Sequence, residues 1–435
     1  MSKIIEAFEN LTNNEKGKAF ELFTKAYLKK IDPVYKEYFE KVWLWNEYSD
    51  RKNRPDIGVD LVALDKYGNK WAIQVKYHEQ YISYTNISTF LSMLNTKEFD
   101  YGMLITKSEL SDRAKMMIAN SQKKIEVITL ARMLEEIDEE TFSWLDPENV
   151  LPPKKKKIRR YQKQAIEEVI KGFDKYDRGK LIMPPGSGKT FVSLKIAERL
   201  VGKGGMVLFI CPSIALLDQT LRAWLSDLEI PIEAFAVVSD KTVGKDKDTF
   251  YNDINLLSIP PTTDFTDLLN NLKHIPQDKM TVIFSTYQSL EVIEKTQKYG
   301  MPELDLAICD EAHRTAGIKL KSEDPTHFQK IHDNKYIKAK RRLYMTATPR
   351  IYEPNLKKKL EELEVDYYSM DDEQKFGKTF FEYTFRQAVD EGYLSDYKVI
   401  IYMMDEKEVQ EKLFDYFKNR NSLNVENSVK LLGLW

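Results

Sequence analysis

The 435-residue sequence has only two cysteines and five histidines, and its formal net charge is only −2. Cys211 and Cys309 both lie in apolar runs, so we expect reduced core residues and no disulfide. The cysteines and histidines form no cluster with the spacing of zinc ligands, which argues against a structural zinc site. No apolar run reaches the ~20 residues of a membrane-spanning helix, and the first residues lack the features of a secretory signal. These absences predict a cytoplasmic protein without a membrane anchor.

The chain does have enough apolar sequence, 42% of its residues, to form two or three domains. Its clearest boundary is Asp146–Pro153, where prolines and charges alternate, followed by the run Lys154–Lys157. The lysine run is either a solvated linker or a contact for nucleic acid, and the sequence leaves both open. We predict four parts: a domain at 1–145, a basic linker at 146–157, a domain at 158–395, and the incomplete start of another at 396–435.

The spacing of apolar residues predicts an α/β fold for both large parts. In the first part we expect helices at 17–29 and 110–119, and strands at 42–45, 58–65, 70–77, 103–106 and 125–128. In the second part we expect buried parallel strands of a doubly wound sheet at 181–183, 206–211, 282–285, 306–309 and 343–346. A last strand is expected at 397–403.

A glycine-containing loop, Met183–Thr190, follows one expected strand and opens a helix. Amides in such a loop bind phosphates, so Gly186, Ser187 and Gly188 are predicted to hold a nucleotide. Lys189 would reach the β- and γ-phosphates, and the Thr190 hydroxyl would hold Mg²⁺. The predicted ligand is therefore ATP with Mg²⁺.

An acidic motif, Asp310-Glu311-Ala312-His313, ends the expected strand at 306–309. A carboxylate at the carboxyl end of a parallel strand lies on the same edge of the sheet as the phosphate loop. Asp310 is therefore predicted to bind Mg²⁺, and Glu311 to orient and deprotonate the attacking water. His313 is assigned to the same nucleotide site.

From about Ile158 to Pro349 the sequence resembles superfamily 2 helicases of the DEAH type, with six motifs in the family's order. Arg159-Arg160-Tyr161-Gln162 resembles their adenine-reading element, with Gln162 as the base contact and Arg159 beside it. Two segments resemble their DNA-backbone motifs. One runs from Pro212 to Gln219, and the other runs from Ser285 to Gln288 and contains Thr286. Thr346-Ala347-Thr348 resembles the motif that couples hydrolysis to DNA movement, through Thr346 and Thr348. The resemblance implies the first RecA-like lobe of a motor on double-stranded DNA.

Asp60, Gln74 and Lys76 lie on the two strands expected on either side of the turn at residues 66–69. Because they alternate with apolar residues, we expect all three on one face of the sheet. A carboxylate and an amide oxygen there would bind Mg²⁺, and the ammonium would polarise water or steady a phosphate.

This spacing resembles the Mrr-like branch of PD-(D/E)xK nucleases over residues 10–140. The motif consists of Asp56–Asp60 together with Gln74-Val75-Lys76, and Glu21 resembles the branch's helical acidic residue. The segment Ile105–Ser108 followed by a helix is also similar. The resemblance implies catalysis by Asp60, Gln74, Lys76 and Glu21; the alternative is a nuclease fold without activity.

A nuclease of this branch fused to such a motor resembles the start of a type ISP restriction-modification enzyme. Segments 369–377 and 388–399 are also similar to that family. The resemblance implies an ATP-driven motor with a Mg²⁺-dependent endonuclease that cuts foreign DNA in phage defence. The family's methyltransferase and target-recognition regions have no counterpart here, so we expect a truncated product, or a subunit that needs a partner carrying them. Without a second lobe, we expect ATP binding with poor hydrolysis; the remaining alternative is a DNA-binding fragment without turnover.

Overall fold

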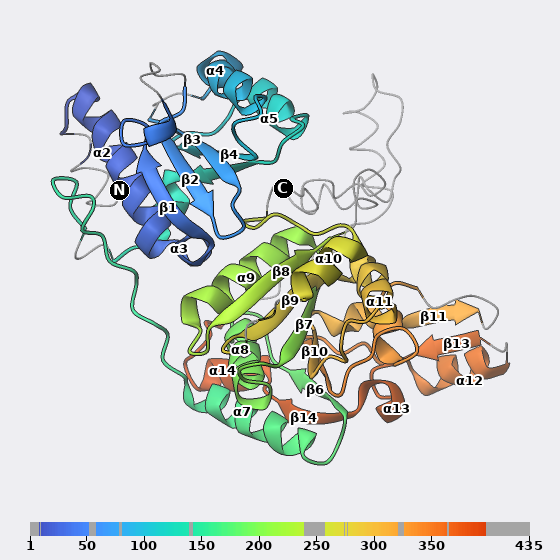
Figure 1. The fold of residues 1–435 in the computed structure, drawn as a ribbon. Coiled ribbons are helices and arrows are strands. Elements are labelled where there is room, and N and C mark those ends of the chain that lie inside the picture. The colour runs from blue at the N-terminus through green and yellow to red at the C-terminus, as the bar shows by residue number, and fades with distance from the viewer. Residues whose placement is uncertain are drawn as a thin grey trace, which may run out of the picture. The chain divides into compact units, whose positions relative to one another are not determined.

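The computed structural model describes Phe8 and residues 10–51, 58–77, 81–138, 142–238, 257–273, 275, 277–320, 326–362 and 365–396. One compact unit ends at Thr384, and it holds both large sheets (Figure 1). A second unit begins at Phe385, where α14 (Phe385–Asp390) is its described helix. Most of the predicted part at 396–435, including the expected strand at 397–403, lies outside the described residues. So do Asp56 and Ile57.

The N-terminal sheet has five strands in sequence order, antiparallel from β1 to β3 and parallel from β3 to β5. They are β1 (Phe39–Leu44), β2 (Leu61–Asp65), β3 (Lys70–Lys76), β4 (Tyr101–Thr106) and β5 (Ile125–Thr129). Its helices are α2 (Asn13–Ala26), the π-helix η1 (Tyr27–Ile31), α3 (Tyr35–Tyr38), α4 (Tyr84–Leu94), α5 (Asp112–Ala119) and α6 (Leu130–Glu135), with a 3-10 turn, η2, at Ser49–Arg51. The predicted strands are all present, with ends shifted by up to three residues.

Helix α2 begins four residues before its predicted start because a capping box precedes the apolar pattern. The Thr12 amide donates to the Glu15 carboxylate at 2.9 Å, and the Glu15 amide donates to the Thr12 hydroxyl at 3.4 Å. These two bonds satisfy amides that a helix start leaves unpaired. The cap thus outweighs Asn13 and Asn14, which are poor helix formers.

Helices cover both faces of this sheet, so its central strands are almost completely buried. On one face Val62, Ala72 and Leu104 pack in the core with residues of α4 and α5. On the other, Trp71 contacts the rings of Tyr35 and Phe39. The face that carries Val62 and Ala72 also carries Asp60, Gln74 and Lys76, because side chains alternate along a strand.

The second sheet has seven parallel strands in the order β14-β6-β12-β10-β7-β9-β8. They are β6 (Arg178–Ile182), β7 (Met206–Cys211), β8 (Ile232–Val237), β9 (Met280–Thr286), β10 (Leu306–Cys309), β12 (Arg342–Thr346) and β14 (Lys378–Glu382). The five predicted strands are present; β8 and β14, at the two edges, were not predicted. This doubly wound parallel sheet confirms the predicted fold class.

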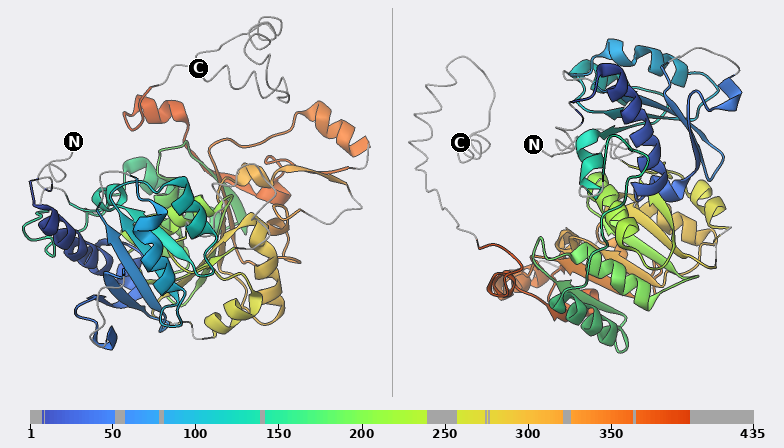
Figure 2. Two further views of the ribbon diagram at one scale, coloured as in Figure 1. Left: turned by 90° about the horizontal axis from the view of Figure 1, so that it is seen from above. Right: turned by 90° about the vertical axis from the view of Figure 1, so that its left-hand side faces the viewer.

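Helices flank this sheet, and a small two-stranded sheet projects from it with α12 (Figures 1 and 2). The helices are α7 (Arg160–Phe173), α8 (Lys189–Leu200), α9 (Ile214–Asp227), α10 (Phe265–Leu272), α11 (Leu290–Lys298), α12 (Pro354–Glu362) and α13 (Glu373–Phe376), with 3-10 turns η6 (Tyr287–Ser289), η7 (Ala312–Thr315) and η8 (Lys330–His332). The small sheet pairs β11 (Gly317–Leu320) antiparallel with β13 (Val365–Tyr368). Among the described residues, no helix has both the length and the apolar composition needed to cross a membrane.

Candidate functional site

The phosphate loop lies between the end of β6 and the start of α8. Gly186 and Gly188 have φ angles of +76° and +85°, a left-handed conformation that side chains disfavour. The Ser187 hydroxyl donates to the carbonyl of Pro184 at 2.6 Å, and the Lys189 ammonium donates to the carbonyl of Met183 at 3.1 Å. The loop is therefore already folded with the N-terminus of α8 behind it, which is the arrangement that binds anions.

Gln162, at the start of α7, is fixed against this loop at both ends of its amide. Its Nε2 donates to the carbonyl of Ser187 at 3.0 Å, and its Oε1 accepts from the amide of Arg159 at 3.0 Å. The Tyr161 hydroxyl donates to the same Ser187 carbonyl at 2.7 Å. A Cβ on Gly188 would come within 2.6 Å of the Gln162 Nε2, so the contact requires glycine there.

A pocket of about 430 Å³ lies over the loop and brings six predicted residues together: Arg159, Gln162, Gly186, Ser187, Gly188 and Thr190. It is also lined by five residues that motif reasoning did not assign: Lys156, Lys157, Phe191, Ala223 and Asp227. The Lys156 ammonium pairs with the Asp227 carboxylate at 2.8 Å, and the Lys155 ammonium donates to the carbonyl of Leu228 at 2.8 Å. The lysine run thus lies against the end of α9 and forms part of the pocket wall.

The acidic motif follows β10, and β12 lies between β10 and the phosphate-loop strand β6. The Asp310 amide donates to the carbonyl of Ile210, and its carbonyl accepts from the Tyr287 hydroxyl at 2.8 Å. Glu311 has a φ angle of +47°, and it is the non-glycine residue with positive φ in the described chain. Such a conformation is rare outside glycine and places local strain in the backbone of this turn.

His313 and Thr346 connect the acidic motif with the end of β12. The His313 Nδ1 lies 3.0 Å from the Thr346 hydroxyl and 3.3 Å from the Glu311 carboxylate. The Thr346 hydroxyl also accepts from the amide of Thr348 at 3.1 Å. The Met183 amide donates to the Thr346 carbonyl at 3.1 Å, so the phosphate loop joins the same chain of contacts.

Burial and neighbouring charge shift the titration of this acidic motif. Burial raises the pKa of the Asp310 carboxyl to about 6, and the adjacent Glu311 adds to the rise while Lys189 opposes it. Burial also lowers the pKa of His313, against the attraction of Glu311. His313 is therefore mainly neutral at pH 7, and its ring can accept or donate one hydrogen bond to Thr346.

The residues that resemble DNA-backbone contacts lie at the carboxyl edge of the parallel sheet. Pro212 follows β7 and is buried, whereas Gln219 is exposed on α9. Thr286 ends β9 and is buried, and its hydroxyl lies 2.7 Å from the Ser289 hydroxyl. Of the coupling residues, Thr346 is buried and Thr348 is exposed. Gln219 and Thr348 are thus the members of this set that reach the surface.

Strand register brings Asp60 and Gln74 opposite each other in the N-terminal sheet. Leu61 pairs with Ile73, and the Asp60 amide donates to the carbonyl of Ile73 at 2.9 Å. The Asp60 carboxylate accepts from the amide of Val75 at 2.7 Å. Lys76 follows two residues after Gln74 on the same face, at the end of β3, and is partly exposed. The expected common face of the three side chains is therefore observed.

Two oxygens of this region are buried without a hydrogen-bond partner among the described residues. They are the Gln74 Oε1 and the Thr106 hydroxyl, and Thr106 pairs with Lys76 in the parallel register of β3 and β4. A buried polar atom without a partner is costly, so it commonly marks a ligand position. An amide oxygen beside the Asp60 carboxylate suits Mg²⁺, which prefers oxygen ligands.

Glu21 and Lys107 flank this site from other elements. Glu21 lies partly buried on α2, a helix that packs against β1 and β3, so the strand register does not fix its distance from Asp60. Lys107 follows β4, and its ammonium lies 2.6 Å from the Tyr77 hydroxyl. In the sequence, only the resemblance of the segment Ile105–Ser108 to the nuclease branch points to Lys107. Within the described residues, no three His, Cys, Asp or Glu side chains are grouped to hold a metal.

Each of the two large domains matches a known protein family. Residues 30–149 match the family described as "Restriction endonuclease", and residues 155–351 match "Type III restriction enzyme, res subunit". Over 245 residues the chain is 26% identical to "Probable helicase A859L" of African swine fever virus (isolate Pig/Kenya/KEN-50/1950), covering 55% of this chain and 24% of the relative. It is 25% identical over 249 residues to the "Type I restriction enzyme EcoAI endonuclease subunit" of Escherichia coli, covering 56% and 24%.

Among solved structures, the chain is similar to the "ATP-dependent Type ISP restriction-modification enzyme LlaBIII bound to DNA". The TM-score is 0.76 at 38% sequence identity, and the match covers 99% of this chain and 28% of that one. The chain thus spans about a quarter of the length of these relatives. Residues 30–149 thus match a restriction endonuclease family and residues 155–351 the res-subunit family, in one chain whose fold is similar to that of a Type ISP restriction-modification enzyme.

Proposed function

We propose that this chain is the nuclease and motor part of an enzyme that cuts foreign DNA and uses ATP to move along it. The observation that carries this proposal is the pocket of about 430 Å³ over the phosphate loop. It combines a phosphate nest, a threonine hydroxyl and a buried glutamine amide, which are the groups that a magnesium nucleotide requires. We also propose the boundaries 1–145, 146–157 and 158–395 for the nuclease domain, linker and first motor lobe.

In the motor, the amides of the loop and the Lys189 ammonium hold the phosphates, while Arg159 and Gln162 contact the base. Thr190 and Asp310 would hold Mg²⁺, which neutralises charge on the transferred phosphoryl group. Glu311 orients the attacking water and takes its proton, so that hydrolysis yields ADP and phosphate. His313 connects Glu311 with Thr346, a path by which hydrolysis can influence the DNA-contacting edge.

In the nuclease domain, Asp60 and the unpaired Gln74 oxygen would hold Mg²⁺, which polarises the scissile phosphate. Lys76 steadies the phosphate or the water that attacks it, and Glu21 supports this set from α2. The Lys107 ammonium, close to the Tyr77 hydroxyl, adds positive charge where a DNA backbone would approach. Hydrolysis breaks one P–O bond of the phosphodiester, so one strand end carries the phosphate and the other carries a hydroxyl.

Double-stranded DNA is the proposed substrate of both domains. Gln219 and Thr348 are exposed at the motor edge, and Pro212, Thr286 and Thr346 shape the backbone that would face DNA phosphates. The DNA-bound Type ISP structure to which this chain is similar supports that partner. Target recognition and methylation would come from further regions or from a subunit that carries them.

The test compares nucleotide binding, ATP turnover and plasmid cutting in the wild type and in Lys189→Ala and Asp60→Ala variants. We expect Lys189→Ala to abolish nucleotide binding and ATP-dependent cutting, because the lysine contacts the phosphates. Asp60→Ala should abolish cutting and leave ATP turnover unchanged. Lys70→Ala is the matched control, because Lys70 lies on the same strand and face as Lys76 but pairs with Asp50 at 3.1 Å.

Each half of the proposal has an outcome that would contradict it. Nucleotide binding that survives Lys189→Ala would place the nucleotide elsewhere, and cutting that survives Asp60→Ala would reject the nuclease site. DNA binding without any turnover in the wild type would favour a binding fragment, or a subunit that needs a partner to complete the motor.

A further inference from the structure

Helix α9 combines, within fourteen residues, contacts that belong to both large domains. Its inner face is apolar, and Trp224 packs edge-on against Phe209 and Phe284 of the parallel sheet. Its opposite face carries two buried charged residues one turn apart, Asp218 and Arg222. A buried charge is stable only when it is paired, so the partners of these residues identify what α9 is built to contact.

Arg222 binds two carboxylates, and both belong to the nuclease domain. Its Nη2 lies 2.8 Å from the Asp32 carboxylate and 2.6 Å from that of Glu136. Its Nη1 also donates to the Ser258 hydroxyl at 3.2 Å. Burial favours the neutral form of Asp32, yet Arg222 and the nearby Arg132 lower the pKa of Asp32 below its ordinary value. The guanidinium therefore joins two nuclease segments to one motor helix through charged hydrogen bonds.

The two carboxylates are themselves built into the nuclease fold. The Asp32 Oδ1 accepts from the amides of Val34 and Tyr35 at 2.8 and 2.9 Å, so it fixes the start of α3. Glu136 follows α6 and accepts from the hydroxyl of Tyr27 in η1. A displacement of Arg222 would therefore act on α3, η1 and α6 together.

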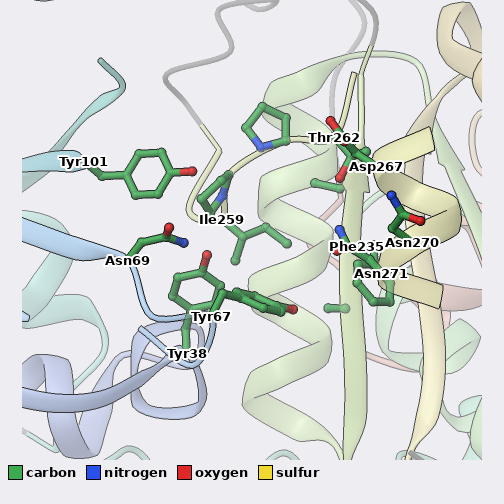
Figure 3. Close-up of a pocket in the computed structure, with 14 residues that line it drawn as sticks. Tyr38, Tyr67, Asn69, Tyr101, Phe235, Ile259, Thr262, Asp267, Asn270 and Asn271 are labelled. Carbon is green, nitrogen blue, oxygen red and sulfur yellow. The ribbon is translucent and has the colours of Figure 1, made fainter. Parts of the chain in front are cut away.

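Further contacts between the domains are made by Lys124, which donates to the carbonyl of Leu257, by Arg132, which donates to the Ser258 hydroxyl at 3.4 Å, and by Glu233. Glu233 of β8 pairs with Lys66, and it accepts from the Tyr67 hydroxyl at 3.0 Å. Next to this pair the domains leave a cavity of about 310 Å³. Figure 3 shows tyrosines of the nuclease domain on one side of it and Thr262 and Asp267 on the other. Among the ion pairs between the domains, the one at Arg222 joins a single buried side chain to two carboxylates.

The same helix also forms a wall of the nucleotide pocket. Ala223 and Asp227 line that pocket, and Asp227 is paired with Lys156 of the segment that leads in from the nuclease domain. Arg222 precedes Ala223 directly, and Asp227 lies about 7.5 Å further along the axis at 1.5 Å per residue. A shift of α9 on nucleotide binding would therefore reach Arg222 without an intermediate element.

We propose that α9 couples the nucleotide pocket to the nuclease domain, and that Arg222 is the positioning residue of this coupling. The inference rests on the proposed nucleotide site and adds a connection between that site and the second domain. Arg222 does not line the nucleotide pocket; it acts by holding Asp32 and Glu136 in register with α9. Coupling of this kind is a free energy shared between two sites, and it is measurable at either one.

The test is hydrogen exchange of the full chain with and without a non-hydrolysable ATP analogue and Mg²⁺. In the wild type, we expect the analogue to slow exchange in the phosphate loop and, at least about fivefold, in residues 27–38 and 130–138. In Arg222→Met, protection of the phosphate loop should remain while the response of the two nuclease segments disappears. Lys66→Met removes the more exposed ion pair and should keep both responses.

A second variant controls for misfolding, because Arg222→Met leaves two carboxylates without their partner. The triple variant Arg222→Met, Asp32→Asn, Glu136→Gln removes all three charges, and such replacements commonly preserve a fold. It should also lose the nuclease response. An unchanged nuclease response in either Arg222 variant, or its loss in Lys66→Met as well, would overturn the role of Arg222. Failure of the phosphate loop itself to respond would instead reject the proposed nucleotide site.

Discussion

Two nearly buried glutamines, one in each large domain, differ in whether their amide oxygen has a partner. Gln162 in the helicase domain has both ends of its amide hydrogen-bonded, to Ser187 and Arg159. Gln74 in the nuclease domain has its oxygen buried without a partner among the described residues. A satisfied buried amide stabilises the local fold, whereas an unsatisfied one costs free energy until a ligand arrives.

The difference reflects the kind of ligand that each site would take. A phosphate group is bound mainly by backbone amides, so the loop must be shaped in advance by glycines and by side chains that hold it. A metal ion needs free lone pairs on oxygens, so its ligands must keep some of their acceptors unused. The phosphate loop is therefore held by hydrogen bonds within the chain, whereas the Gln74 oxygen has an acceptor position that the proposed ion would use.

The largest effect should come from Gly188→Ala, which changes the shape of the phosphate loop. The residue has a φ angle of +85°, and a methyl group there would meet the Gln162 amide at 2.6 Å. We expect nucleotide affinity to fall about a hundredfold, as the loop and Gln162 separate, which is about 2.7 kcal/mol. Calorimetric titration with ADP measures it.

Gly68→Ala is the control for the left-handed backbone alone. Gly68 has a φ angle of +86°, but open space surrounds the position of its missing Cβ. Both variants have similar backbone strain, and only Gly188→Ala has the steric clash. Equal nucleotide affinity in Gly188→Ala and Gly68→Ala would mean that the contact with Gln162 does not shape the loop.

Exchange of each glutamine for leucine should affect stability in opposite ways. Gln162→Leu leaves the Arg159 amide without its acceptor, so we expect the free energy of unfolding to fall by about 1–3 kcal/mol. Gln74→Leu removes an unsatisfied oxygen, so we expect no loss of stability beyond about 1 kcal/mol, together with a loss of Mg²⁺-dependent cutting. Urea unfolding of both variants measures the pair. A large destabilisation by Gln74→Leu would show that its oxygen is paired in solution.

The sequence was sufficient to predict where the residues of the proposed nucleotide site lie, because they belong to contiguous motifs at strand ends. Each of Gly186, Lys189 and Asp310 lies in the loop or turn predicted for it, since parallel strands present their carboxyl ends at one edge. The common face of Asp60 and Gln74 also followed from strand alternation alone. The predicted fold class and the central strands are confirmed for the same reason: their apolar runs are long and uninterrupted.

What the sequence did not reveal depends on contacts between distant segments. Strand β14 is short and partly exposed, and its Phe380 occupies the space that a Cβ on Gly179 would need, a relation invisible in either segment. The sequence does not decide whether the lysine run is a linker or a DNA contact, because Lys156 pairs with Asp227, which lies seventy-one residues away in the chain. The pairing of Arg222 with Asp32 has the same origin. Roles of the site residues in binding and catalysis stay predictions.

The smallest effect concerns pH, and it tests whether burial of the acidic motif raises the pKa of Asp310. Burial and Glu311 raise the pKa of Asp310 to about 6, so its carboxylate gains a proton as the pH falls through 6. Because the folded-state pKa lies above the ordinary value, ionised Asp310 destabilises the fold near neutral pH, and protonation between pH 7 and 4 relieves this. Mg²⁺ requires the ionised form, so affinity for the magnesium nucleotide should fall below pH 6, approaching tenfold per pH unit.

Glu311→Gln tests whether the charge of Glu311 helps to raise the pKa of Asp310. Removing the neighbouring charge lowers the pKa of Asp310, so the midpoint of magnesium-nucleotide binding should move to lower pH while affinity at pH 8 changes little. His313 is the control group: because burial already keeps its pKa low, His313→Gln should leave the midpoint near 6. If the midpoint stays in place in Glu311→Gln and moves in His313→Gln, the titrating group is His313.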